Sequence, residues 1–204
     1  MEVAGPSRSH DQQTVISLLQ RCGADLVLLD GALGRSHHAS PAIADGVVLA
    51  TGAALGGGMA DVLRKTRDRL AILGIAPAPA DVAALVQATF AQGGVGVWSQ
   101  EGQCLFNEPI ASLNAGAALL AVQDRMLPGA PGIALMAMSG AVGQLLWRAV
   151  LTLQDRHAGL TLVVADGTKL FIDAADVAHF ERRGGRLLAM RGIRLLGVTL
   201  NPFS

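Results

Sequence analysis

The stretch of residues 25–59 contains two short apolar runs, and each of them ends in a polar pair that includes glycine. Residues 26–29 stop at Asp30-Gly31, and residues 47–50 stop at Thr51-Gly52. Apolar runs without alternation are typical of strands that are covered on both faces, as in parallel α/β sheets. Open parallel sheets bind ligands beyond the carboxyl ends of their strands. The residues that close these two runs are therefore the first functional candidates.

The rest of the chain alternates between apolar runs and helical periodicity. Runs at 133–138, 160–165, 187–190 and 195–200 predict strands, while 3.6-residue periodicity predicts helices near 9–22, 59–73, 79–90, 112–126 and 142–153. This order predicts an α/β fold with three layers and a mostly parallel open sheet, Rossmann-like or P-loop-like without a P-loop. We expect one domain over 1–204, with a helix and a hairpin in 75–127 as a candidate insertion or sub-domain. The chain is expected to begin partway into the fold.

Composition limits the classes of function. Of the 204 residues, 51% are hydrophobic and 16% are charged, and sixteen basic residues balance sixteen acidic ones. A formal net charge of zero gives no electrostatic case for nucleic acid or for an anionic membrane. Cys22 and Cys104 stand alone, which favours reduced thiols in a cytoplasmic protein. The uncharged residues 126–147 are broken by Pro128 and Pro131, so we expect a strand and a helix start there and no membrane span.

Small polar residues recur where the expected strands end. The candidates for ligand binding are Ser7, Asp30, Gly31, Arg35, Ser40, Thr51, Gly52, Ser139, Asp166, Thr168, Lys169 and Asn201. Along one rim they would form an anion or nucleotide site, with Asp30 and Asp166 as candidate Mg²⁺ ligands. The competing interpretation is ordinary turn and capping chemistry, which uses the same residue types. We weigh the two evenly for the set.

Formal nucleotide motifs are incomplete. Residues 52–57 have the glycine spacing of a Walker A loop, but Gly58-Met59 replaces the Lys-Ser/Thr pair that binds phosphate and metal. Asp30 resembles a Walker B carboxylate without its partner loop. His37-His38 favours a solvated loop over a catalytic triad, because no G-x-S-x-G elbow accompanies it. The charged residues between 61 and 68 favour a solvated helix face.

Four segments together resemble a known family: VAGPS, LVLLDGALGRSHHASPAIADGVVLATGAAL, VVADGTKLFI and GVTLNPFS. They are similar to reactivase-like accessory proteins of the adenosylcobalamin- and PLP-dependent lysine and ornithine aminomutases. The resemblance matches Asp30, Gly31, Arg35, Ser40 and Pro41 to the family's Asp-Gly-Ala loop, and Asp166, Thr168 and Lys169 to its Asp-Gly-Thr-Lys loop. Gly34 departs from the polar residue expected there. The resemblance implies a cobalamin-dependent aminomutase as partner.

Three hypotheses follow. The first is an accessory protein that binds a nucleotide or another phosphate ligand at the strand ends, with a nucleotide and Mg²⁺ as the candidate cofactor. The second is a Mg²⁺-dependent transferase or ligase that uses nucleotides. The third is a non-catalytic subunit of a homo-oligomer, since an Ala-rich apolar chain often leaves surface that needs a partner. The sequence determines neither the ligand nor the strand order.

Overall fold

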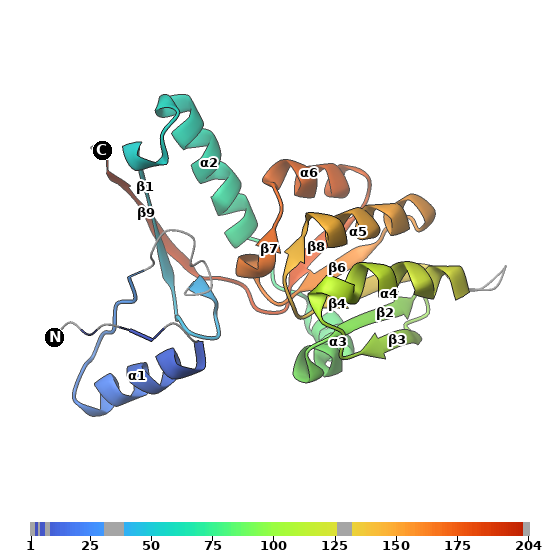
Figure 1. Ribbon diagram of the computed structural model, residues 1–204, viewed down its shortest axis with the longest axis horizontal. Helices are drawn as coiled ribbons and strands as arrows, with labels where there is room; N and C mark the ends of the chain where they lie inside the picture. The colour runs from blue at the N-terminus through green and yellow to red at the C-terminus, as the bar shows by residue number, and fades with distance from the viewer. Residues whose placement is uncertain (1–2, 4, 7–8, 31–38, 126–131, 202–204) are drawn as a thin grey trace.

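The computed structural model describes residues 3, 5–6, 9–30, 39–125 and 132–201. Its largest sheet is open and has five strands in the order β3-β2-β4-β6-β8 (Figure 1). The strands are β2 (Val95–Ser99), β3 (Cys104–Glu108), β4 (Ile133–Met138), β6 (Thr161–Val164) and β8 (Arg186–Ala189). The α/β class and the open sheet predicted from the sequence are therefore confirmed.

The five-stranded sheet is mixed. Strands β4, β6 and β8 run parallel, with Met136 opposite Leu162 and Leu162 opposite Leu187. Strand β2 is antiparallel to both β3 and β4, which confirms the predicted hairpin. Residues 75–127 contribute this hairpin to the main sheet, and their status as an insertion stays a prediction. The parallel part of the sheet supplies three carboxyl ends at one edge.

Alternate residues of the central strands pack into two cores, one on each face. Met136 and Met138 of β4 lie in one core, whereas Leu135 and Ala137 lie in the other. The first face is covered by α4 (Ser112–Arg125), α5 (Gln144–Arg156) and α6 (Ala174–Arg182), and the second by α3 (Ala80–Gln92). Because helices cover both faces, the strands read as continuous apolar runs.

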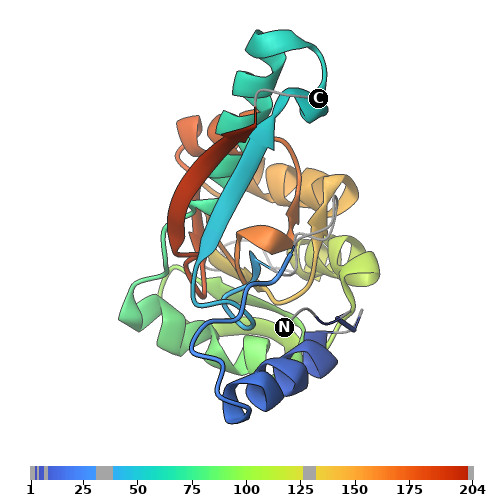
Figure 2. The ribbon, with the colours of Figure 1, turned by 90° about the vertical axis from the view of Figure 1, so that its left-hand side faces the viewer.

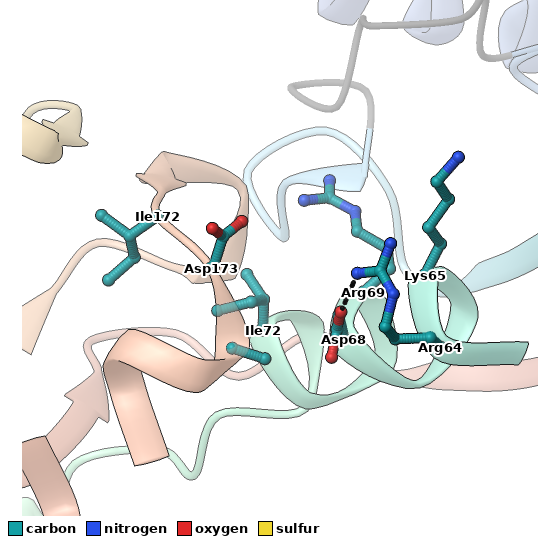
Figure 3. A pocket seen from close by; sticks show the side chains of 8 residues that line it. Arg64, Lys65, Asp68, Arg69, Ile72, Ile172 and Asp173 are labelled. Carbon is teal, nitrogen blue, oxygen red and sulfur yellow. Dashed lines mark hydrogen bonds and ion pairs between the residues drawn. The ribbon is translucent and has the colours of Figure 1, made fainter. Parts of the chain in front are cut away.

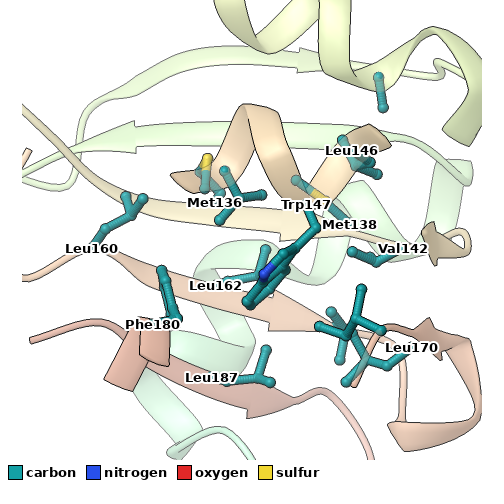
Figure 4. Close-up of a cluster of buried hydrophobic side chains, with 14 of the residues drawn as sticks. Met136, Met138, Val142, Leu146, Trp147, Leu160, Leu162, Leu170, Phe180 and Leu187 are labelled. Atoms are coloured by element: carbon teal, nitrogen blue, oxygen red, sulfur yellow. The ribbon is translucent and has the colours of Figure 1, made fainter. Parts of the chain in front are cut away.

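The larger core centres on two aromatic side chains. Trp147 of α5 and Phe180 of α6 are almost fully buried, and their ring centroids lie 5.3 Å apart in a tilted arrangement. Figure 4 shows Trp147 among Met138, Leu162 and its other neighbours above the sheet. Buried aromatic pairs add roughly 0.5–1.5 kcal/mol beyond the area they bury. This packing fixes α5 and α6 over the parallel strands.

A second, smaller sheet stands apart from the main one. Strands β1 (Val47–Gly52) and β9 (Leu195–Asn201) pair in parallel, with Leu49 opposite Val198. They project from the body together with the turn η2 (Ala53–Leu55) and helix α2 (Gly58–Leu73), as Figures 1 and 2 show. Helix α1 (Ser9–Arg21) lies below this ribbon in Figure 1. We call β1 and β9 the β1/β9 ribbon.

The prediction of a buried strand at residues 26–29 is wrong in this structure. These residues form coil, and the side chains of Leu26 and Leu28 are 75% and 83% exposed. An apolar run becomes a buried strand only where a neighbouring strand and covering helices are available, and among the described residues β1 pairs with β9 alone. The strand predicted at residues 47–50 is confirmed as part of β1, but it is only half-buried. Two neighbouring runs therefore fall outside the main sheet.

Two short elements complete the description. Strands β5 (Val142–Gly143) and β7 (Leu170–Phe171) form a small parallel pair beside the main sheet.

Within the described ranges, no helix has both the length and the apolar character needed to cross a membrane.

Candidate functional site

A cavity of about 570 Å³ lies at the carboxyl ends of the three parallel strands. Ser139 follows β4, Ala165 and Asp166 follow β6, and Met190 and Arg191 follow β8. The remaining lining side chains are Gln13, Ser40, Ala42, Ile43, Gln87, Phe90, Ala91 and Lys169. This is the position at which open α/β sheets bind ligands. We call it the strand-end cavity.

Asp166 is the buried polar centre of this cavity. Its Oδ1 accepts hydrogen bonds from the backbone N–H of Thr168, at 2.8 Å, and from the Thr168 hydroxyl, at 2.5 Å. Its Oδ2 accepts a hydrogen bond from the Ser40 hydroxyl at 2.8 Å. The first bonds cap the turn η3 (Gly167–Lys169), which places Lys169 at the cavity. Buried carboxyl groups need such donors, and here each oxygen of Asp166 has at least one.

One wall of the cavity comes from the amino-terminal part of the chain. Ser40 is buried, and its bond to Asp166 joins residues that lie 126 positions apart. The Gln13 side-chain amide donates a hydrogen bond of 2.5 Å to the carbonyl of Ala42, which ties α1 to the same wall. The Ser40 hydroxyl also accepts the N–H of Ala42 at 3.4 Å. These contacts bring α1 and residues 40–43 over the strand ends.

Another wall of the cavity comes from α3. Gln87, Phe90 and Ala91 are spaced by three and four residues, so they lie on one helical face. Phe90 packs partly against the smaller core, as does Met190 after β8. The α3 wall is therefore apolar with one amide, and the strand-end floor is polar.

Two cationic side chains line the cavity. Lys169 sits at the end of η3, and Arg191 follows β8, where its backbone N–H donates to the carbonyl of Ala165 at 3.0 Å. In the part of the chain that the structure describes, neither cationic side chain has a hydrogen-bond or ion-pair partner. The Ser139 hydroxyl donates to the carbonyl of Gly94 at 3.1 Å. The cavity therefore offers positive charge to a ligand.

The structure brings together only part of the predicted rim. Ser40, Ser139, Asp166 and Lys169 line the strand-end cavity, and Thr168 supports Asp166. Ser7, Gly31 and Arg35 lie outside the described residues, as do His37 and His38. Arg191, Gln87 and Phe90 were missed by sequence reasoning. The position of Arg191 directly after an expected strand was the available signal for it.

The other predicted residues lie on the β1/β9 ribbon or in coil. Thr51 shares a hydrogen bond of 2.6 Å with the Thr66 hydroxyl of α2, and Gly52 pairs with Asn201. Any side chain at Gly52 would meet the Asn201 carbonyl, so the glycine allows the close approach of the two strands. Asp30 is exposed in coil. Thr51, Gly52 and Asn201 thus form a second group on the β1/β9 ribbon, and none of the three lines the strand-end cavity.

The predicted Mg²⁺ ligands are Asp30 and Asp166. Within the described ranges, no group of three or more His, Cys, Asp or Glu side chains is placed to hold a metal ion. Asp30 is exposed in coil, whereas Asp166 is buried and accepts hydrogen bonds from Ser40 and Thr168. A role for either carboxylate in Mg²⁺ binding stays a prediction.

A second hollow of about 370 Å³ lies between α2 and the start of α6. Figure 3 shows Arg64, Lys65, Asp68 and Arg69 on α2, with Asp173 across from them. Asp61 forms ion pairs with Lys65 at 2.7 Å and with Arg64 at 2.6 Å, and Arg64 also forms an ion pair with Asp68 at 3.2 Å. This matches the solvated helix face predicted from the charges.

Electrostatics distinguish the charged side chains of α2 in and beside this hollow. Hydrogen bonds from Lys65 and then Arg64 hold the pKa of Asp61 below its ordinary value. Burial lowers the pKa of Arg69, which has no ion pair within the described ranges. Arg64 and Lys65 are paired with carboxylates, which leaves Arg69 as the unpaired cation among the described residues of this hollow. The strand-end cavity has two such cations, Lys169 and Arg191, so we regard it as the better candidate site.

In comparisons with protein-family models, with curated proteins and with solved structures, nothing matched this chain. Fold and cavity therefore define the class by themselves: an α/β protein with an open mixed sheet and a ligand-sized cavity at the ends of its parallel strands.

Proposed function

We propose that this chain binds an anionic small molecule that carries phosphate, with nucleotides as the leading class, in the strand-end cavity. The observation that carries the proposal is that three successive parallel strands and η3 bring Ser139, Lys169 and Arg191 to one cavity. A volume of about 570 Å³ lies within the roughly 300–1,000 Å³ that is usual for small-molecule sites.

The charges favour an anion. Lys169 and Arg191 have no ion-pair partner in the described part of the chain, so a phosphate gains two charge-assisted contacts without breaking an existing pair. Asp166 faces the same cavity, but Ser40 and Thr168 already donate to its oxygens. Its role in the proposal is to position η3, and through it Lys169.

The apolar wall favours a ligand with a non-polar or aromatic part. Phe90, Ile43 and Met190 lie on the cavity surface and are only partly buried. A nucleotide combines a phosphate with a planar ring, which suits a cavity lined by two cations and an aromatic side chain.

The proposed biological role is that of a reactivase-like accessory protein for a cobalamin-dependent aminomutase, in a Rossmann-like or P-loop-like arrangement without a P-loop. The resemblance stated for the sequence supports this role. The resembling Asp-Gly-Thr-Lys loop is also the loop that carries Asp166, Thr168 and Lys169. Complex formation between the purified chain and a purified lysine or ornithine aminomutase, measured by size exclusion, tests the partner directly.

Thermal stabilisation by a ligand panel tests the binding proposal. ATP, ADP, GTP and NAD would each be added at millimolar concentration, with and without Mg²⁺. A ligand present at a hundred times its Kd adds about 2.7 kcal/mol to the free energy of unfolding. We expect a clear rise in Tm with at least one member, which Lys169→Ala abolishes and Lys65→Ala retains. Loss of the shift in Lys65→Ala alone would move the ligand to the α2 hollow and overturn the proposal.

A further inference from the structure

The α2 hollow, between α2 and the start of α6, is lined by two side chains of opposite charge that have no partner. Arg69 belongs to α2 and is partly buried, and Asp173 directly precedes α6. Of the hydrogen bonds and ion pairs in the described part of the chain, none uses either side chain. A cation and a carboxylate thus line one hollow without pairing with each other.

Arg69 in particular calls for an anion. Burial lowers the pKa of its guanidinium, so the charged form has lost part of its contact with water. Buried charges are normally paired, because removing an ion from water is costly without a compensating contact. The neighbouring cations Arg64 and Lys65 have such contacts with Asp61 and Asp68, whereas Arg69 has none within the described residues.

Apolar side chains line the same hollow. Ile72 near the end of α2 and Ile172 before α6 are both buried there, and Ala174 begins α6. The volume of about 370 Å³ lies near the lower end of the roughly 300–1,000 Å³ that is usual for small-molecule sites. The hollow therefore suits a small ligand that has an apolar part as well as charges.

We propose that the α2 hollow binds a free α-amino acid with an apolar side chain. The ligand's carboxylate pairs with Arg69, whose planar guanidinium matches a carboxylate in two parallel hydrogen bonds. Its ammonium group donates to Asp173, which lies across the hollow from α2 (Figure 3). Its side chain packs against the two isoleucines.

The charge balance of the α2 hollow favours such a zwitterion over a phosphate. Three cations on α2 are matched by three carboxylates in or beside the hollow: Arg64, Lys65 and Arg69 against Asp61, Asp68 and Asp173. A phosphate would bring its negative charges close to Asp173, whereas a zwitterion brings one charge of each sign. The ligand class therefore differs from the one proposed for the strand-end cavity, whose two cations are unpaired.

Isothermal titration calorimetry with L-leucine and two derivatives tests the proposal. N-acetyl-L-leucine lacks the ammonium group, and L-leucinamide lacks the carboxylate. We expect L-leucine to bind, and each derivative to bind at least about tenfold more weakly, because each loses a charge-assisted contact. Equal affinities for all three compounds, or no binding of leucine, valine or alanine at millimolar concentration, would overturn the proposal.

Two substitutions locate the ligand in the hollow. Asp173→Asn keeps a residue that caps helices about as well as aspartate, and Arg69→Met keeps an apolar stem without the charge. We expect each variant to weaken leucine binding at least about tenfold. Arg148→Met, which removes an exposed cation from α5, is the control and should bind leucine as the wild type does. Unchanged leucine binding in either hollow variant would overturn the proposal.

Direct pairing of Arg69 with Asp173 is the competing outcome. A double-mutant cycle of Arg69→Met and Asp173→Asn, measured by urea unfolding without ligand, tests for it. We expect the effects of the two substitutions to add, since no ion pair joins these described side chains. Strong coupling between the substitutions would show that the two side chains satisfy each other, and would overturn the proposal.

Discussion

At the scale of single residues, Asp166 organises the strand-end cavity through three hydrogen bonds. Two come from Thr168 in the next turn, and the third comes from Ser40, far away in sequence. The carboxyl group therefore joins the cavity floor to the wall formed by residues 40–43. The sequence marked both Ser40 and Asp166 as candidates, but their contact depends on tertiary structure.

Removal of the Ser40 hydroxyl should destabilise the fold. In Ser40→Ala, Asp166 Oδ2 loses its donor while it remains buried, and an unsatisfied buried group costs about 1–3 kcal/mol. Urea unfolding measures this loss. Ser17→Ala, at an exposed position on α1, is the control and should be nearly neutral. Equal free energies of unfolding in the two variants would contradict the role given to Ser40.

His157 predicts a pH dependence of stability. Burial, and then the charge of Arg156, lower the pKa of His157 in the folded chain, where Nδ1 accepts the N–H of Ile133 at 3.2 Å. As the pH falls below the unfolded value of about 6.5, the unfolded chain gains a proton more readily than the folded chain. Stability should therefore fall from about pH 6.5 downward and level off below the folded pKa.

Urea unfolding at pH 7.5 and 5.5 tests this dependence. His157→Asn is the matched control, because an amide oxygen can accept the same N–H without titrating. We expect the wild type to lose more stability than the variant between the two pH values. An identical loss in both would show that His157 does not contribute to the dependence.

At the scale of elements, the sequence predicted the main-sheet strands well because helices cover them on both faces. The run at residues 133–138 became β4, with its side chains divided between the two cores. The equally apolar segment 26–29 is coil in the structure. This difference could not be predicted, because the run itself contains no information about which strand could pair with it. Pairing is a long-range property, so periodicity cannot supply it.

The cavity wall was harder to predict for the same reason. Gln87 and Phe90 lie on α3, a helix that the sequence predicted. The sequence could not show that α3 lies over the strand ends, because that position depends on the order of the strands. The sequence was equally compatible with one shared rim and with ordinary turns at separate strand ends. The structure divides them between the main sheet and the β1/β9 ribbon.

The junction between α2 and η3 gives a prediction at this scale. A side chain at Gly167 would run into the carbonyl group of Ile72 near the end of α2. Gly167→Ala should therefore lower the free energy of unfolding by roughly 1–3 kcal/mol, as overpacking does. Gly116→Ala on α4 is the control, since a side chain there meets only ordinary contacts. Denaturant midpoints compare the two, and equal midpoints would contradict the close packing.

At the scale of the whole molecule, a three-layer body carries the strand-end cavity, while the β1/β9 ribbon and α2 project from it (Figures 1 and 2). The body holds the two cores, whereas the ribbon holds much of the exposed apolar surface. The proposed phosphate-ligand binding therefore belongs to the body.

The distribution of lysines makes the central proposal directly measurable. The chain contains two lysines, and each lines a different hollow: Lys169 the strand-end cavity and Lys65 the α2 hollow. Acetylation with acetic anhydride, quantified by mass spectrometry with and without ATP, ADP, GTP or NAD, compares the two side chains within one sample. We predict that at least one ligand lowers the labelling of Lys169 several-fold and leaves Lys65 unchanged. Unchanged labelling of Lys169 with every ligand, or protection of Lys65 alone, would contradict phosphate-ligand binding at the strand ends.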